Sequence, residues 1–151
     1  MLYLILKWSH ILAAIIALGT NLTYPLWLIL AHRKPEALIF TLRTVKAIDD
    51  WLANPAYVLS FFTGAGMMYV GGIPWSTPWI VPVLVLYGIV SVLGLAVYSP
   101  LLKKQIKLVD TAGHEAAEYK SLALRNNILG GGISMMVIVI TFLMTVKPRL
   151  W

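Results

Sequence analysis

His10 is the side chain of this sequence best suited to chemistry. It stands within the apolar amino-terminal stretch, in the run Leu-Lys-Trp-Ser-His-Ile-Leu-Ala-Ala. An ionisable group inside hydrocarbon is costly, so such residues are rare and usually face a partner inside a helix bundle. A neutral imidazole nitrogen is also a common axial ligand of haem iron. His10 is therefore a candidate haem ligand, with a hydrogen bond between helices or a proton relay as the alternatives.

Further polar residues share the helix face of His10. Lys7, His10, Asn21 and Pro25 follow one another at helical spacing, with two alanines between them. Asn21 is a candidate for contact with a cofactor on this face. Lys7, one turn outward, and Lys147, near the carboxyl end, are candidates for pairing with haem propionates, and snorkelling to the membrane interface is the alternative for both. Pro25 lacks a backbone N–H and releases the carbonyl of Asn21, which predicts a kink.

Three methionines are candidates for the sixth ligand of a haem. Met67 and Met68 belong to the second apolar stretch, at a depth that matches His10, and Met144 lies somewhat shallower in the last one. Met68 is the candidate metal ligand of the pair. Methionine ligation raises the reduction potential of a haem. Packing in an apolar interior is the alternative for each of them.

The composition places the chain among membrane proteins. Hydrophobic residues make up 60% of the 151 residues and charged residues only 12%. Cysteine is absent, which excludes structural disulfides, thiolate metal sites, iron–sulfur clusters and covalent attachment of a c-type haem. Any haem must therefore be haem b, held without a covalent bond.

Long apolar stretches predict an all-α, polytopic membrane protein in which residues 1–151 form one domain, a four-helix bundle. The expected helices cover about 3–31, 51–72, 79–100 with a cytoplasmic extension, and 128–146. Each is long enough to cross about 30 Å of hydrocarbon, and helices satisfy their own backbone hydrogen bonds there. Between the first two, residues 32–50 mix apolar and charged positions and predict an amphipathic connector helix on the cytoplasmic membrane surface.

The charges predict the orientation. Nine of the twelve Lys and Arg residues and all six acidic residues lie in the two connectors at 32–50 and 101–125. Basic connectors face the cytoplasm, so both termini are expected outside. The net charge of +6 thus indicates membrane topology and lipid contact, and argues against nucleic-acid binding. Tryptophans are expected as anchors at the outer interface (Trp8, Trp75, Trp79, Trp151) and at the inner one (Trp27, Trp51).

A polar cluster, Arg125-Asn126-Asn127, precedes the last apolar stretch. Arg125 has three alternatives: capping a connector, binding lipid phosphate, or pairing with Asp49 or Asp50. We favour the ion pair, because polar contacts at the mouth of a helix commonly set its register.

The opening run, followed by Gly19, Asn21 and Tyr24-Pro25-Leu26-Trp27, resembles a bacterial integral membrane family of uncharacterised function. That group is similar to HemJ-type protoporphyrinogen oxidases and, more distantly, to the CopD copper-resistance membrane domain. Arg125-Asn126-Asn127 and Val146-Lys147-Pro148 resemble the last helix of the HemJ type. The resemblance implies a four-helix bundle in a bacterial inner membrane, with haem b ligated by His10.

The sequence departs from the HemJ type in two places. That type carries an acidic residue after its Arg-x-x-Asn pattern, where Asn127 stands after Asn126 here, and a Lys in its third helix, where residues 79–100 contain none. We therefore favour a haem protein for electron transfer, redox sensing or haem handling, with a quinone or a redox protein as partner. A HemJ-like porphyrinogen oxidase, a haem-dependent membrane oxidoreductase, is the second hypothesis.

Two further interpretations stay open. Methionines with His10 would suit Cu(I) in a copper-handling module of the CopD kind, and a purely structural subunit needs no cofactor. Small residues in the later helices (Gly88, Ser91, Gly94) serve packing within the chain or a homo-oligomer equally well.

Overall fold

The computed structural model of the protein describes residues 1–149, apart from the side chain of His32. All regular secondary structure in that range is helical, which confirms the all-α prediction. The elements in chain order are α1 (Leu2–His32), α2 (Pro35–Ile48), η1 (Asp49–Ala53), α3 (Asn54–Gly71), α4 (Ile80–Val92), η2 (Leu93–Tyr98), α5 (Ser99–Ala112) and α6 (Ala117–Val146), where η1 and η2 are π-helical turns.

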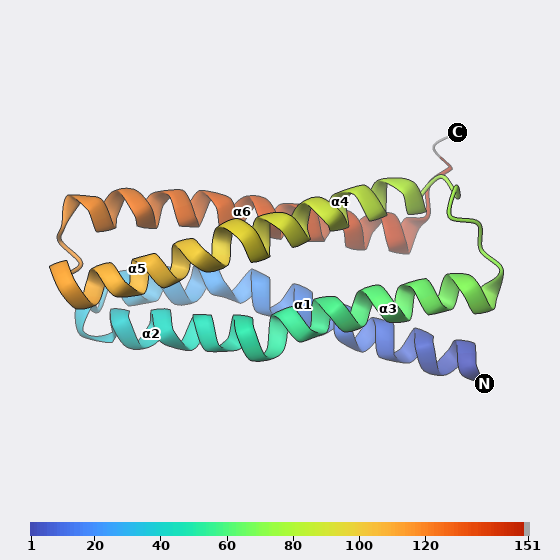
Figure 1. Ribbon diagram of the computed structural model, residues 1–151, viewed down its shortest axis with the longest axis horizontal. Helices are drawn as coiled ribbons and strands as arrows, with labels where there is room; N and C mark the ends of the chain where they lie inside the picture. The colour runs from blue at the N-terminus through green and yellow to red at the C-terminus, as the bar shows by residue number, and fades with distance from the viewer. Residues whose placement is uncertain (150–151) are drawn as a thin grey trace.

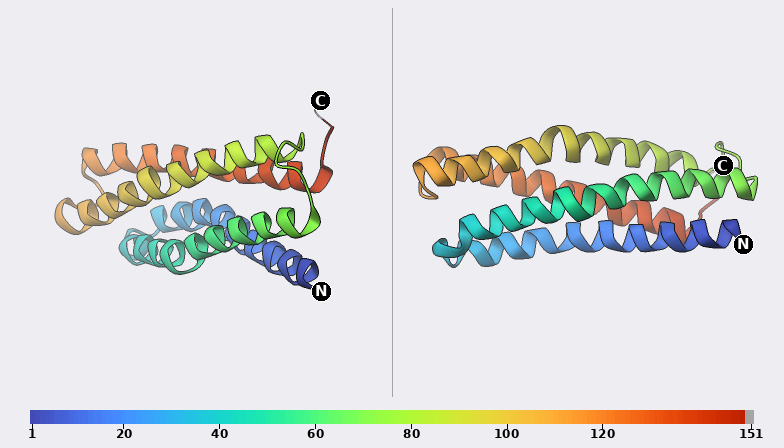
Figure 2. Two further views of the ribbon diagram at one scale, coloured as in Figure 1. Left: turned by 45° about the vertical axis from the view of Figure 1, so that its right-hand side comes forward. Right: turned by 60° about the horizontal axis from the view of Figure 1, so that its bottom comes forward.

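Within residues 1–149 these elements join into four long rods (Figure 1). α2, η1 and α3 follow one another without a break, as do α4, η2 and α5, while α1 and α6 are rods of their own. α1 packs on α2 and α3 to form one hairpin, and α6 packs on α4 and α5 to form the other. Figure 2 shows the two hairpins as two layers, with both chain ends and the connector 72–79 at the same end.

Each π turn comes just before a proline. Pro55 follows η1 and Pro100 follows η2, in both cases at the first turn of the next α-helix. A proline cannot donate its backbone N–H and crowds the preceding turn, so the regular hydrogen-bond ladder cannot continue through it. The local rewinding lets each rod stay continuous across its proline.

The helices extend beyond the apolar stretches that predicted them. The second helical rod begins at Pro35 and not at 51, the third continues to Ala112, and the fourth begins at Ala117 and not at 128. Hydropathy marks only the part of a helix that suits hydrocarbon, whereas amphipathic sequence continues the same helix into water. Residues 101–125 are therefore divided, the first part continuing the third rod and the last part opening the fourth.

α2 differs from the expected surface-lying connector. It is helical and amphipathic, and its apolar stripe buries Leu38, Leu42 and Val45. However, it continues in line with α3 and packs against α1 and α5 instead of lying alone (Figure 1). Other helices cover the apolar face of α2, so this face does not have to be covered by lipid.

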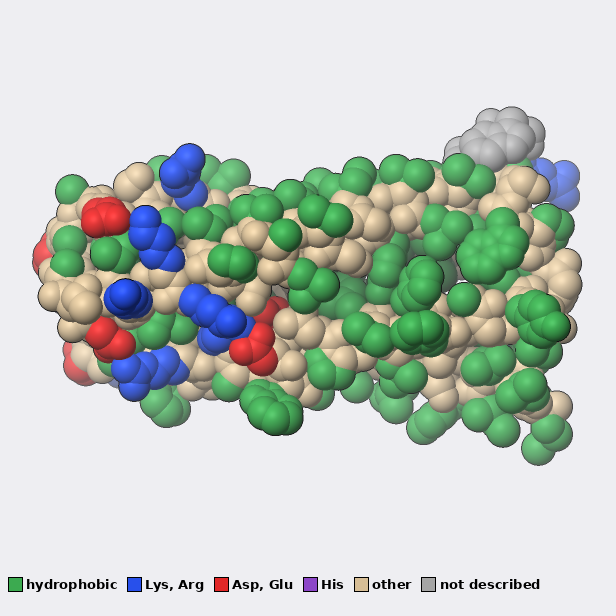
Figure 3. All heavy atoms as spheres, in the orientation of Figure 1, with side chains coloured by type: hydrophobic (Ala, Val, Ile, Leu, Met, Phe, Trp, Pro, Cys, Tyr) green, Lys and Arg blue, Asp and Glu red, His purple; other side chains and the backbone are tan. Residues whose placement is uncertain are grey.

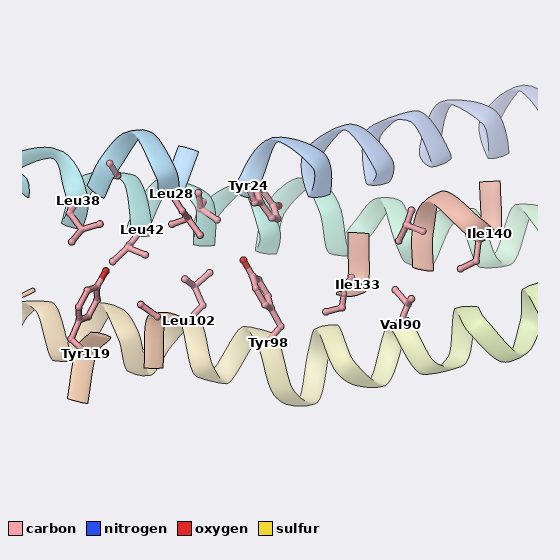
Figure 4. Packing of buried hydrophobic residues seen from close by; sticks show 14 of the residues in the cluster. Tyr24, Leu28, Leu38, Leu42, Val90, Tyr98, Leu102, Tyr119, Ile133 and Ile140 are labelled. Carbon is pink, nitrogen blue, oxygen red and sulfur yellow. The ribbon is translucent and has the colours of Figure 1, made fainter. Parts of the chain in front are cut away.

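The molecule has two unlike halves. We call residues 22–53 and 93–130 the charged half, because they contain all six acids and nine of the twelve Lys and Arg residues (Figure 3). Residues 2–21, 54–92 and 131–146 form the apolar half, whose surface is mostly hydrophobic. The largest fully buried side chains all belong to the charged half (Tyr119, Leu38, Leu42, Leu102, Gln105, Val45, Asn126), and Figure 4 shows several of them meeting between the rods.

Within the described residues, three helical ranges are long and apolar enough to cross a membrane: Leu2–Ala31, Ile80–Ala112 and Ala117–Val146. The expected crossing at 51–72 is not among them, because α3 carries polar and small residues between its apolar ones. Trp8 and Trp75 expose their rings at the end of the apolar half, as expected of interface anchors, and Trp151 lies outside the described residues.

Candidate functional site

The His10 ring lies against α3. Its Nδ1 atom is 2.9 Å from the backbone oxygen of Ser60 and 3.3 Å from Oγ1 of Thr63. Gly64 makes room for the ring, since a Cβ at that position would lie 3.1 Å from Cε1 of His10. The half-buried imidazole therefore occupies a notch in α3. The notch is formed by the hydroxyl of Thr63, the backbone oxygen of Ser60 and the absence of a side chain at Gly64.

These contacts fix which ring nitrogen carries the proton. A backbone carbonyl only accepts, so Nδ1–H donates to Ser60. The hydroxyl of Thr63 is itself directed to the backbone oxygen of Leu59, at 2.7 Å. Nε2 of a neutral ring is then an acceptor, and no described residue hydrogen-bonds to it. A histidine held in this way joins α1 to α3 and keeps one lone pair available.

The methionines lie close to this notch in sequence but do not complete it. Met67 and Met68 are on α3, one turn beyond Thr63 and Gly64 toward the end that carries the termini, and Met68 is buried. Met144 packs, half-buried, against the main hydrophobic cluster. In the described part of the chain, the ring's hydrogen-bond partners are Ser60 and Thr63, so no methionine sulfur is among them.

The two candidate lysines are both at the surface. Lys7 is exposed on α1, one turn from His10. Lys147 follows the last turn of α6 in a left-handed conformation, with φ of 50°, and its ammonium group lies 5.4 Å from the ring centroid of Trp79. This cation–π contact holds the end of α6 beside the start of α4.

Asn21 is three turns along α1 from His10 and makes a separate contact between the same two helices. Its Nδ2 atom donates to the hydroxyl of Tyr57, at 2.8 Å, and to the backbone oxygen of Ala17, at 2.9 Å. The carbonyl of Asn21, which Pro25 leaves without an intrahelical donor, accepts a hydrogen bond from Ser134 of α6, at 3.3 Å. The predicted release of this carbonyl thus serves to bind the two hairpins together.

A cavity of about 40 Å³ with a mainly apolar lining lies at the border of the two halves. Tyr24 and Pro25 of α1, Tyr98 of η2 and Asn126 of α6 are part of its wall. Figure 4 shows Tyr98 extending from η2 toward Tyr24 across the interior. Oδ1 of Asn126 has no hydrogen-bond partner in the described residues, and Tyr24 Oη, which has Thr20 as a polar neighbour, makes no hydrogen bond of normal length there.

A buried polar column leads from the turn at 113–116 to this cavity. The hydroxyl of Tyr119 and Nε2 of Gln105 are 3.3 Å apart, and Nδ2 of Asn126 donates to Oε1 of Gln105, at 3.0 Å. Tyr119 is 2% exposed, and Gln105 and Asn126 are fully buried. The column therefore joins α5 to α6 through buried side chains.

Asp49 of η1 is a buried acid beside the same region. It is 8% exposed, and its one hydrogen bond comes from Asn54 Nδ2, at 3.5 Å. Burial raises the pKa of the Asp49 carboxyl, the charge of buried Lys46 opposes the rise, and the neighbouring Asp50 adds to it. Lys46 itself pairs with Asp50, one turn away on the same rod. The ion pair of Lys46 with Asp50 therefore leaves Lys46 less able to neutralise the charge of Asp49.

The comparison with known families decides the class of protein. Residues 4–148 match the family described as predicted integral membrane proteins, DUF2269. The chain belongs to this family. No curated protein and no solved structure matches it. The expectation of an integral membrane protein is confirmed for this DUF2269 protein, and the likeness to the HemJ and CopD types remains a resemblance of short motifs.

Sequence reasoning chose the wrong member of the polar cluster 125–127, which lies within α6. Arg125 is exposed and pairs with no acid in residues 1–149, whereas its neighbour Asn126 is the buried member of the polar column. A signal for this was present. Tyr119, Asn126 and Ile133 stand seven residues apart and so lie on one face of α6, the face that is buried.

Proposed function

We propose that this DUF2269 protein binds haem b in the membrane, with Nε2 of His10 as an axial ligand of the iron. One observation carries the proposal: Nδ1 of His10 donates to the backbone oxygen of Ser60, and Nε2 has no partner among the described residues. Histidines that bind a metal usually donate their other ring N–H to a carbonyl or a carboxylate, which fixes the tautomer and raises the basicity of the ligand.

The residues around the notch fit a haem in their chemistry. Gly64 lets the ring lie close against the backbone of α3, and Met67 and Met68 supply thioethers one turn farther on. Lys7 and Lys147 lie toward the end of the apolar half, where propionates would meet water. A bound haem supplies reversible one-electron chemistry of the iron, which serves electron transfer, redox sensing or haem handling with a quinone or a redox protein as partner.

The proposal includes a membrane arrangement. The apolar half spans the bilayer of the bacterial inner membrane as a four-helix bundle, with α3 as the crossing next to α1. The charged half extends into the cytoplasm, and both termini lie outside. Its support is the gathering of acidic and basic residues in one half and the three helices that suit hydrocarbon by length and composition. Less apolar α3 suits a position against other helices, since small and polar residues favour helix contacts in membranes.

Absorption spectra of the protein purified in mild detergent test the haem proposal. We expect a Soret band, porphyrin by mass spectrometry, and loss of most of both in His10→Ala, because the imidazole is the ligand. His114→Ala is the matched control, since that histidine lies in the turn 113–116 and pairs with Glu115 at the surface. It should keep the full spectrum. Circular dichroism of both variants confirms that the helices remain.

The remaining outcomes separate the rival functions. A colourless preparation that cannot take up added hemin would refute haem binding. A full Soret band in His10→Ala would refute the ligand. Copper in place of iron porphyrin on metal analysis would favour the CopD-like module, and rescue of an oxidase-deficient strain would favour the HemJ-like enzyme. A helical, colourless His10→Ala protein of lowered stability, with no haem in the native protein either, would leave His10 as a purely structural link.

A further inference from the structure

We propose that the cavity between the hairpins holds water, and that the buried Asp49 carboxyl, which is not part of the cavity lining, takes up and releases protons in exchange with the aqueous phase on the side of the charged half. This site is separate from His10. The inference starts from polar atoms that lack partners and from a buried acid that the haem proposal leaves without a role.

Hydration follows from the size and the wall of the cavity. A water molecule needs roughly 10–15 Å³ of such volume and two to four polar partners, so about 40 Å³ has room for two or three waters. Oδ1 of Asn126 and Oη of Tyr24 offer an acceptor and a donor that the described residues do not satisfy. Buried polar atoms are nearly always satisfied by protein or by ordered water, so water is the expected occupant.

Asp49 lies within electrostatic reach of this wall. Asp49 makes no hydrogen bond to this wall, and only the field of its charge acts on Tyr24 and Tyr98, which line the cavity, and on Tyr57 of α3. A buried carboxylate normally accepts several hydrogen bonds, and Asp49 accepts one long one. A nearby water molecule could donate the missing hydrogen bonds, or a proton on the carboxyl group could remove the buried charge.

The neighbour of Asp49 in the chain, Asp50, reaches the surface. Lys46 pairs with Asp50, and the side chain of Asp50 is 45% exposed. A proton from bulk water that reaches an Asp49 oxygen forms an O–H bond there, and the same bond breaks when the proton returns to water. The groups that face Asp49 are Lys46 of α2, Asp50 of η1, Asn54 and Tyr57 of α3, Tyr24 of α1 and Tyr98 of η2.

The direction of the pH dependence follows from the burial of Asp49. Because burial raises the pKa of this carboxyl in the folded protein, the folded state holds the proton more tightly than the unfolded state does. The resulting contribution to stability is fully present below the unfolded pKa and is lost as pH rises through the folded pKa. Asp49→Asn should therefore flatten this part of the stability profile, while Asp50→Asn should not remove it.

Infrared titration in detergent tests the proton site directly. We expect a carbonyl band of a protonated carboxyl group that disappears at a higher pH than the bands of exposed acids and is missing from Asp49→Asn. In Asp50→Asn the band should persist but disappear at a lower pH than in the native protein, because Asp50 adds to the rise of the Asp49 pKa and holds Lys46. The same band should persist in His10→Ala, so this result and the haem result can fail independently. The proposal is overturned if Asp49→Asn retains the band, or if replacing Na⁺ by choline shifts its titration, which would indicate a cation site.

A labelling experiment tests the water without relying on Asp49. The chain has no cysteine, so single cysteines at Asn126 and at Val90 report on their own surroundings. Asn126 lines the cavity, and Val90 is a buried core residue of α4. A small water-soluble methanethiosulfonate should modify Asn126→Cys at least tenfold faster than Val90→Cys, because the reaction needs a hydrated thiolate. Equal rates would mean a dry cavity and would refute the proposal.

Discussion

The charged and the apolar halves bury their residues against different surroundings. In the charged half, large side chains such as Leu102 and Tyr119 are removed from solvent by other helices alone. In the apolar half, many large hydrophobic side chains stay exposed on the protein, as Val85 and Phe62 do. The charged half thus contains a core like that of a soluble protein, although Phe40 and Trp51 stay exposed on it, whereas the apolar half has none of the largest fully buried side chains and leaves most of its hydrophobic surface for lipid to cover.

Polar groups show the same contrast. In the charged half, hydrogen bonds join Tyr119, Gln105 and Asn126 into one column between α5 and α6. The apolar half joins α1 to α3 through single contacts, with His10 on Ser60 and Asn21 on Tyr57. Since helices in lipid gain little from burying apolar surface, isolated polar links and close backbone approach carry more of the specificity there.

Shortening a side chain should give the largest difference in stability loss between the charged half and the apolar half. Leu102→Ala removes a fully buried side chain in the charged half and should lower the free energy of unfolding by about 2–5 kcal/mol, because it leaves a cavity. Val85→Ala is the matched change in the apolar half, where the side chain is 57% exposed, and should change it by less than about 0.5 kcal/mol. Denaturation by SDS in mixed micelles, followed by circular dichroism, measures both. Equal losses would contradict the contrast between the halves.

The sequence predicted the helices better than it predicted their partners. Uninterrupted apolar runs identified the parts of α1, α4 and α6 that suit hydrocarbon, since composition alone determines that property. The continuation of α2 into α3 was not foreseen, because the mixture of charged and apolar residues at 32–50 predicted a separate amphipathic helix on the membrane surface. Charge ends the part of a helix that fits a bilayer, but it does not end the helix.

The candidate site shows where a single sequence stops being informative. His10 stood out because its type is rare in an apolar stretch, and the structure gives it a specific partner. That partner is a backbone oxygen of Ser60, which no side-chain pattern can predict. Thr63 and Gly64 are ordinary residues whose part in the notch depends on how α1 and α3 are rotated against each other. Asp49 was expected only as a possible ion-pair partner of Arg125, and the helix packing shows that it is buried.

Filling the notch beside His10 should have an intermediate effect. Gly64→Ala puts a methyl group about 3.1 Å from Cε1 of the ring, so the ring or α3 has to shift. We expect a loss of roughly 1–3 kcal/mol in the free energy of unfolding, as for other overpacked sites, and a weaker or shifted Soret band if haem binds there. Gly88→Ala is the control, because nothing lies within 4 Å of the added group. A Gly64→Ala protein with native stability and spectrum would show that the ring does not depend on this contact.

The smallest effect should come from the ion pair that links the hairpins at the surface. Arg43 of α2 and Asp110 of α5 are 2.8 Å apart, with side chains 62% and 42% exposed. Such pairs contribute about 0.2–1 kcal/mol in water and less as salt screens them. Asp110→Asn should therefore cost less than about 1 kcal/mol, and high salt should shrink the difference. Glu118→Gln, which removes the pair with Lys104 inside one hairpin, provides the comparison. A larger, salt-insensitive loss in Asp110→Asn alone would mean that the hairpins of the charged half depend on this pair rather than on Leu38, Leu42 and Leu102 between them.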